Sequence, residues 1–125
     1  MKIDVVEILD ENVRAETQFG TIYGKMITDS AIKRNSYDVE INIDGMLNMD
    51  RIELSSIAVP SISCKDDKVH ITGLVEEIED GVLLLRLKES LIMIEISDIE
   101  SMEKYIGKFV VISTHSLCLY DTHYN

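Results

Sequence analysis

The sequence predicts a mainly β protein, an antiparallel Greek-key barrel or sandwich with one short helix near residues 98–106. Branched side chains dominate the apolar set, because the 125 residues include 18 Ile and 10 Val but 3 Ala, and branched residues favour strands whereas Ala favours helices. Strand patterns recur along the chain, and an Asp-Gly pair between two of them is a strong hairpin signal. The length, and the lack of a Gly/Ser/Pro-rich linker near the midpoint, predict a single β-rich domain over residues 1–125.

The first half contains strand patterns separated by short polar breaks. In residues 37–44, Tyr, Val and Ile alternate with Asp, Glu and Asn, which predicts one buried and one wet face. Gly45 ends this strand, and residues 28–36 are predicted to be an irregular connection. Further strands are predicted over residues 3–9, over 13–27 as one long strand bent at Gly20, and over 51–59 up to Pro60.

The second half is more regular. The pair Asp80-Gly81 lies between two strand patterns and suits a type I′ turn, in which both central residues have positive φ. Strands are predicted over 69–78, 82–87, 91–96, 109–114 and 117–120, the last two joined by a tight turn near His115-Ser116.

The helix predicted over 98–106 rests on local signals. Ser97 and Glu100 fit a capping box, apolar residues follow at helical spacing, and Gly107 is a suitable stop. Three strands, a helix and two strands is the layout of an OB-like barrel, so residues 69–121 are expected to form one. We find no internal repeat that relates the two halves.

The net charge of −11, from 12 Lys and Arg against 23 Asp and Glu, limits the classes of partner. A nucleic-acid binder needs a basic patch and stacking aromatics, and this chain has 6% aromatic residues and no Trp. Asp4 and Glu7 interrupt any secretory signal, and no apolar run approaches the roughly 20 residues of a membrane span. We therefore expect a cytoplasmic protein with no nucleic-acid or membrane contact, in which Cys64 and Cys118 are buried and reduced.

Catalytic and metal-binding motifs are missing from the sequence. We expect the scattered His70, His115 and His123 to be surface residues. Residues 40–45 resemble the start of a calcium loop, but Arg51 stands where the loop needs a bidentate Glu. We predict no enzyme activity, no catalytic residue, no metal and no cofactor, the alternative being a carboxylate site in which clustered acids raise one another's pKa.

Acidic residues concentrate in two segments of the second half and nearly vanish after Gly107. They lie on the predicted hairpin, the strand after it and the helix, and they are Glu76, Glu77, Glu79, Asp80, Glu95, Asp98, Glu100 and Glu103. One interpretation is a solvated face, and the other is a docking surface for a basic protein, because complementary charge raises association rates. Met46 and Met49 are candidates for its apolar anchor, or for packing under a loop.

The general character of the chain resembles that of the immunity proteins of bacterial toxin systems, such as contact-dependent growth inhibition. The resemblance rests on the segments YDVEINIDG, EDGVLLLRLKESLIMIEI and GKFVVISTHSLCLYDT. It implies a protein that binds a basic toxin domain, often a nuclease, and occludes it. We therefore expect an acidic protein-binding module of this kind. The alternative is a structural or adaptor subunit of a cytosolic assembly that docks through an OB-like domain.

Overall fold

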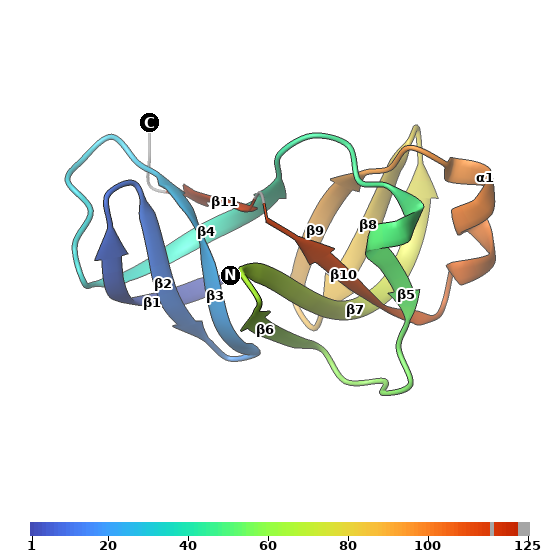
Figure 1. Ribbon diagram of the computed structural model, residues 1–125, viewed down its shortest axis with the longest axis horizontal. Coiled ribbons are helices and arrows are strands. Elements are labelled where there is room, and N and C mark those ends of the chain that lie inside the picture. Colours follow the sequence, from blue (N-terminus) through green and yellow to red (C-terminus); the bar gives the residue numbers. More distant parts are fainter. Residues whose placement is uncertain (116, 123–125) are drawn as a thin grey trace.

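The computed structural model describes residues 1–115 and 117–122 and consists mainly of strands (Figure 1). The strands are β1 (Lys2–Leu9), β2 (Asn12–Thr17), β3 (Gly20–Ile27), β4 (Ser36–Ile43), β5 (Ile52–Leu54), β6 (Ser61–Lys65), β7 (Lys68–Glu79), β8 (Val82–Leu87), β9 (Ser90–Glu95), β10 (Phe109–Thr114) and β11 (Leu117–Asp121). The helical segments are α1 (Ile99–Met102) and the 3-10 turns Met49–Arg51 and Glu103–Tyr105. The predicted β barrel with one short helix is confirmed.

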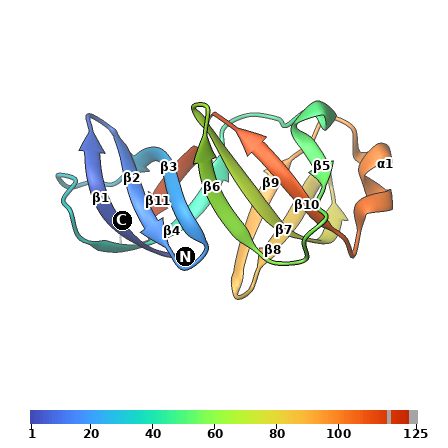
Figure 2. The ribbon, with the colours of Figure 1, turned by 60° about the horizontal axis from the view of Figure 1, so that its bottom comes forward.

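The strands close into two rings that lie side by side (Figures 1 and 2). The first barrel has the order β1-β2-β3-β11-β4, and β1 pairs back to β4. The second barrel has the order β7-β8-β9, then residues 47–54, then β10, which pairs back to β7. In that segment, Leu47 forms a parallel bridge with Ile96, and β5 pairs with β10. In each ring, the segment from the other half of the chain lies between the third and the fourth strand. This is the place of the fifth strand in an OB-like Greek-key barrel, so we call this segment the fifth strand of its barrel.

The fifth strand of each barrel comes from the other half of the chain. β11 follows β10 in sequence but pairs with β3 in parallel and with β4 in antiparallel fashion. Residues 47–54 follow β4 but complete the second barrel. The prediction that residues 69–121 form a barrel by themselves is therefore wrong in its last strand. An alternating apolar pattern specifies which face of a strand is buried, but it does not specify the partner strands.

The two barrels repeat each other at a spacing of 70 residues, which corrects our finding of no repeat. The register of β1-β2-β3 becomes that of β7-β8-β9 when 70 is added to each residue number. Both carry a bulge at the same place, between Val5 and Glu7 and between Val75 and Glu77. Few residues in these ladders are identical, so the repeat is one of burial more than of residue type. The identical pairs are Val5/Val75, Glu7/Glu77, Ile8/Ile78, Asp10/Asp80 and Ile22/Ile92.

Two of the predicted local structures are present as expected. Val39 and Ile41 of β4 are buried and Glu40 between them is exposed, so the predicted alternation is confirmed. Asp80 and Gly81 have φ of 51° and 80°, which are the positive values that a type I′ turn requires.

The chain near Gly20 differs from the prediction. Residues 13–27 form the hairpin of β2 and β3 instead of one bent strand. Gly20 has φ of 132°, and a Cβ there would lie 2.0 Å from the carbonyl oxygen of Ile62. The glycine therefore allows both the turn and the close approach of β6, which pairs with β3 at this point and links the barrels.

Two further boundaries differ. The strand predicted over 51–59 is limited to β5, because the hydroxyl of Ser55 bonds both backbone groups of Ile57 and turns the chain. The N-cap of α1 is Asp98 and not Ser97, since Asp98 Oδ1 accepts from the backbone N of Ser101. The backbone N of Ser97 instead donates to the carbonyl oxygen of Leu47 at 3.0 Å, which helps to hold residues 47–54 in the second barrel.

Candidate docking face

The predicted acidic segments lie at one end of the second barrel. Ile96 N donates to the carbonyl oxygen of Gly81 at 3.2 Å, which ties the β7–β8 turn to the chain leading into α1. A Cβ on Gly81 would lie 3.5 Å from Ile99 Cδ1, so the turn also adjoins the helix. The acids that these adjoining segments carry are Glu79, Asp80, Glu95, Asp98 and Glu100, and Glu103 follows at the end of α1.

Three of the acids share the outer face of the β7-β8-β9 sheet with apolar side chains. Two neighbouring cross-strand rows form this surface, and they are Glu77–Leu84–Met93 and Glu79–Val82–Glu95. The three glutamates are exposed, and Met93 is 59% exposed. Leu84 and Val82 are half-buried between them. We call these six residues the acidic face.

The carboxylates of Glu77, Glu79 and Glu95 form no ion pair with any residue that the structure describes. Two other acids of the predicted set have partners within the protein. Glu76 lies in the bulge, and its Oε2 is 2.8 Å from Arg86 Nη2. Asp98 caps α1, and its Oδ2 accepts from Ser101 Oγ at 2.8 Å. Glu76 and Asp98 therefore already have partners within the protein.

A groove of about 320 Å³ adjoins the acidic face between the two barrels. The residues that line it from the acidic face are Val82, Met93 and Glu95. The first barrel lines it with Asn42, Ile43, Asp44, Gly45, Cys118 and Tyr120. Tyr120 is 39% exposed, so an aromatic ring and two carboxylates border the apolar centre.

The two methionines proposed as an anchor have different positions. Met46 is 62% exposed and lies in a shallow depression with Ile43 and Asp44, next to the groove. Met49 is partly buried and packs on the hydrophobic core. Met46 therefore remains available to a partner, whereas Met49 has the packing role that we gave as the alternative.

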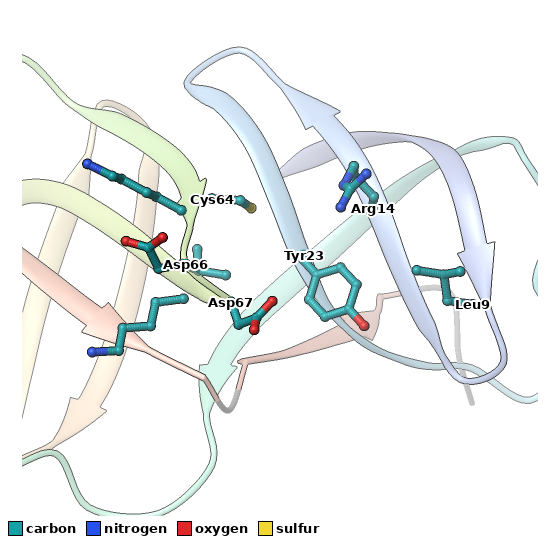
Figure 3. Close-up of a pocket in the computed structure, with 9 residues that line it drawn as sticks. Leu9, Arg14, Tyr23, Cys64, Asp66 and Asp67 are labelled. Carbon is teal, nitrogen blue, oxygen red and sulfur yellow. The ribbon is translucent and has the colours of Figure 1, made fainter.

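A larger cavity, of about 580 Å³, lies between β1–β3 and the β6–β7 turn (Figure 3). Arg14 and Tyr23 lie on one side of it, and Asp66 and Asp67 lie on the other. Its charges are mixed, and Arg14 is already paired with Glu7. The cavity therefore does not select a ligand by charge.

The cysteines differ from the prediction that both are buried. Cys118 is half-buried, whereas Cys64 is exposed at the end of the short strand β6, where its Sγ donates to the carbonyl of Thr21. Partial burial raises the pKa of both thiols. Glu16 adds to the shift at Cys64 while Arg14 opposes it. Both are therefore weak nucleophiles at neutral pH.

His70 and His115 each have a hydrogen-bond partner on a neighbouring strand or turn. His70 is half-buried, with Nδ1 2.8 Å from Ser113 Oγ, and the exposed His115 has Nδ1 3.0 Å from the carbonyl of Asp67. His123 and the predicted turn position Ser116 lie outside the described residues. Among the described residues, no cluster of His, Cys, Asp and Glu is suited to a metal ion. No helix in that part of the chain is long and apolar enough to cross a membrane.

The apolar members of the acidic face, and Tyr120 across the groove, are absent from our predicted site. For the apolar members a signal was present in the segments VLLLRL and SLIMIE, in which most outward positions are apolar where a half-wet strand should be polar. Val82 and Leu84 on β8 and Leu91 and Met93 on β9 break the alternation in this way. Such a two-sided apolar hairpin indicates a second packing surface.

No protein-family model matches the sequence, and neither the curated proteins nor the solved structures compared with it give a match. The acidic face combines an exposed thioether, a bordering tyrosine and three carboxylates that no cation of the described residues pairs with.

Proposed function

We propose that the protein is an acidic protein-binding module that docks on a basic protein, in the manner of a toxin-neutralising immunity protein. The supporting observation is that Glu77, Glu79 and Glu95 gather on one face with no cation from the described residues paired to them. Carboxylates placed close together repel one another. A cationic partner relieves this repulsion, so the same charges that are unfavourable in the free protein favour the complex.

The apolar side chains of the face supply what charge alone does not. Tight complexes depend on a few well-packed apolar or aromatic anchors, surrounded by polar residues that exclude water. Met93 and Met46 are exposed and Leu84 is half-buried, with acids around them. A partner that covers this area loses apolar surface to solvent and pairs its cations at the rim. For a toxin domain, occlusion of the surface that binds its substrate is sufficient for neutralisation.

The proposal predicts that a basic toxin domain is encoded beside this protein, and the test uses that domain as the partner. We expect a complex whose association rate constant, measured by stopped flow, falls about tenfold or more between low and high salt. The variant E79K/E95K should slow association by about tenfold. The matched control E53K/E89K reverses two exposed acids away from the face and should change the rate less than about twofold.

Three results would oppose the proposal. Failure to form a complex with the toxin domain would remove the immunity function. Equal effects of E79K/E95K and E53K/E89K would mean that net charge, and not this face, governs association. Stable recovery of the protein with a cytosolic assembly and no toxin would favour the adaptor function.

A further inference from the structure

The acidic face has a counterpart in the first barrel, because the two barrels share one register. The counterpart rows lie 70 residues earlier, and they are Glu7–Arg14–Tyr23 and Leu9–Asn12–Lys25. The backbone pairing is the same in both places. Differences between the two faces therefore reflect their side chains.

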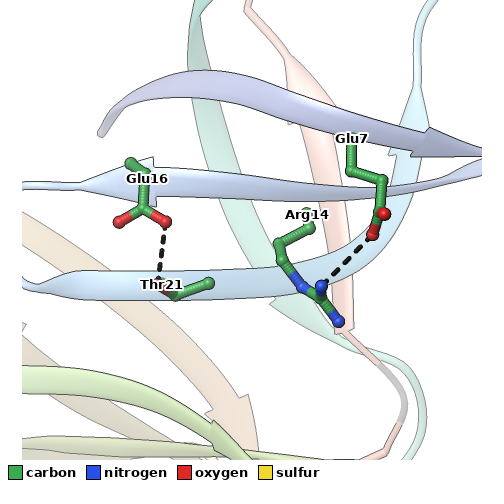
Figure 4. A network of polar contacts seen from close by, with 4 residues as sticks. All are labelled: Glu7, Arg14, Glu16 and Thr21. Carbon is green, nitrogen blue, oxygen red and sulfur yellow. Dashed lines mark hydrogen bonds and ion pairs between the residues drawn. The ribbon is translucent and has the colours of Figure 1, made fainter.

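The counterpart face neutralises its acids from within the fold. Arg14 Nη1 lies 3.2 Å from Glu7 Oε1, across the β1–β2 ladder (Figure 4). Lys25 Nζ lies 3.6 Å from Glu11 Oε2 in the adjoining turn. Each cation on this face thus has an acid of the same barrel beside it.

The acidic face has no cation at the two positions that match Arg14 and Lys25. Leu84 occupies the position of Arg14, so Glu77 keeps the place of Glu7 without its ion-pair partner. Glu95 occupies the position of Lys25, so a positive charge is replaced by a negative one. The result is an apolar centre where the first barrel has an ion pair.

We propose that a partner supplies these two cations in trans, as two arginines of an extended basic protein segment. This proposal rests on the proposed function and names the chemistry of the segment that docks. In an extended segment, residues two apart point to the same side, so two arginines with one spacer reach one face together. Their aliphatic stems pack over Leu84 and Met93, and their guanidinium groups meet the carboxylates of Glu77 and Glu95.

The groove favours arginine over lysine. A guanidinium group is planar, can pair with a carboxylate through two hydrogen bonds, and stacks on an aromatic ring. Tyr120 and Asp44 line the groove opposite Met93 and Glu95, so one arginine head can be enclosed between the two walls. A compact ammonium group gains less from this arrangement.

The experiment titrates the isotope-labelled full-length protein with the synthetic peptide Gly-Arg-Ser-Arg-Gly and follows amide chemical shifts by NMR. We expect shifts confined to β7–β9 and the groove, with binding at least about threefold weaker for the lysine peptide Gly-Lys-Ser-Lys-Gly. The variant L84R/E95K restores the charge pattern of the first barrel and should raise the Kd at least about tenfold. The control L54R/E53K makes the same residue changes at exposed positions of β5 and should leave the Kd within about twofold.

A second variant guards against loss of folding through the half-buried Leu84. E77K/E95K changes exposed residues only, and it should raise the Kd of the arginine peptide to the same degree as L84R/E95K. Unchanged binding by L84R/E95K and E77K/E95K, or equal binding of Gly-Glu-Ser-Glu-Gly, would overturn the inference. If the arginine peptide does not bind while the toxin domain binds and E79K/E95K slows its association, the docking segment is wrong while the proposed function stands. If the arginine peptide binds as described and no toxin domain does, the function fails and the chemistry of the face stands.

Discussion

Because each barrel contains a strand from the other half of the chain, we predict that a substitution in one half changes the stability of the barrel in the other half. Leu119 of β11 is fully buried, and it pairs with Met26 of β3 and Ile41 of β4. We therefore expect L119A, at the end of the chain, to weaken the barrel built from its beginning. Buried Leu-to-Ala changes cost about 2.7–5 kcal/mol, and every 1.4 kcal/mol is about tenfold in an equilibrium constant. The opening equilibrium of the first barrel should therefore rise about a hundredfold or more.

Native-state hydrogen exchange measured by mass spectrometry locates this effect. In L119A, peptides from β1–β4 should lose protection first, while β7–β10 retain more of theirs. Leu47 is the matched position in residues 47–54, since it is 5% exposed and bridges Ile96 of the second barrel. L47A should therefore give the reverse pattern. Loss of protection in β7–β10 first, or equally in both barrels, for L119A would refute the assignment of β11 to the first barrel.

Two further predictions concern packing and the thiols. A Cβ at Gly24 would lie 2.7 Å from the carbonyl oxygen of Leu117, so G24A should push β3 away from β11. We expect it to lower the free energy of unfolding, measured by urea denaturation, by about 1–3 kcal/mol. An unchanged urea midpoint would contradict this contact. The raised pKa of Cys64 and Cys118 favours the neutral thiol in the folded state, so this contribution to stability is full below the ordinary thiol pKa and is lost as pH rises through the raised values. The urea midpoint of C64S/C118S should therefore fall less than that of the wild type between neutral pH and pH ~10, and an equal or larger fall would show that other groups govern the alkaline response.

Most strands could be predicted from the sequence because the alternation of apolar and polar residues in a strand follows its buried and exposed faces. In β4 the alternation of Val39, Glu40 and Ile41 is complete, and the Asp-Gly turn has the backbone angles that its residues favour. These signals are local, so they can be recognised in the sequence without knowledge of the fold. The pairing of strands is not local. The alternation that buries Leu117 and Leu119 specifies a buried face of β11, but it does not specify that the partners of β11 are β3 and β4.

The acidic site was predicted in part for the same reason. The sequence shows that acids are clustered, but whether neighbouring acids share a face depends on register. Glu76 and Glu77 are adjacent, yet Glu76 pairs with Arg86 while Glu77 stands opposite Leu84. Leu84 stands where the first barrel has the cation of Arg14, and the register of both barrels is needed to match the two positions. That comparison requires the 70-residue repeat, which few identical residues reveal.

The bulge explains how the acidic face arises on β7. Val75 and Ile78 both turn toward the interior although they are three residues apart, a spacing that puts residues on opposite faces of a regular strand. One extra residue at the bulge resolves the conflict, and it directs Glu77 and Glu79 outward. Because β1 has the same bulge between Val5 and Glu7, the backbone alone presents an outward glutamate in both barrels. The residue across the ladder then decides the outcome. Arg14 pairs with Glu7 within the fold, whereas Leu84 leaves Glu77 with no ion pair among the described residues.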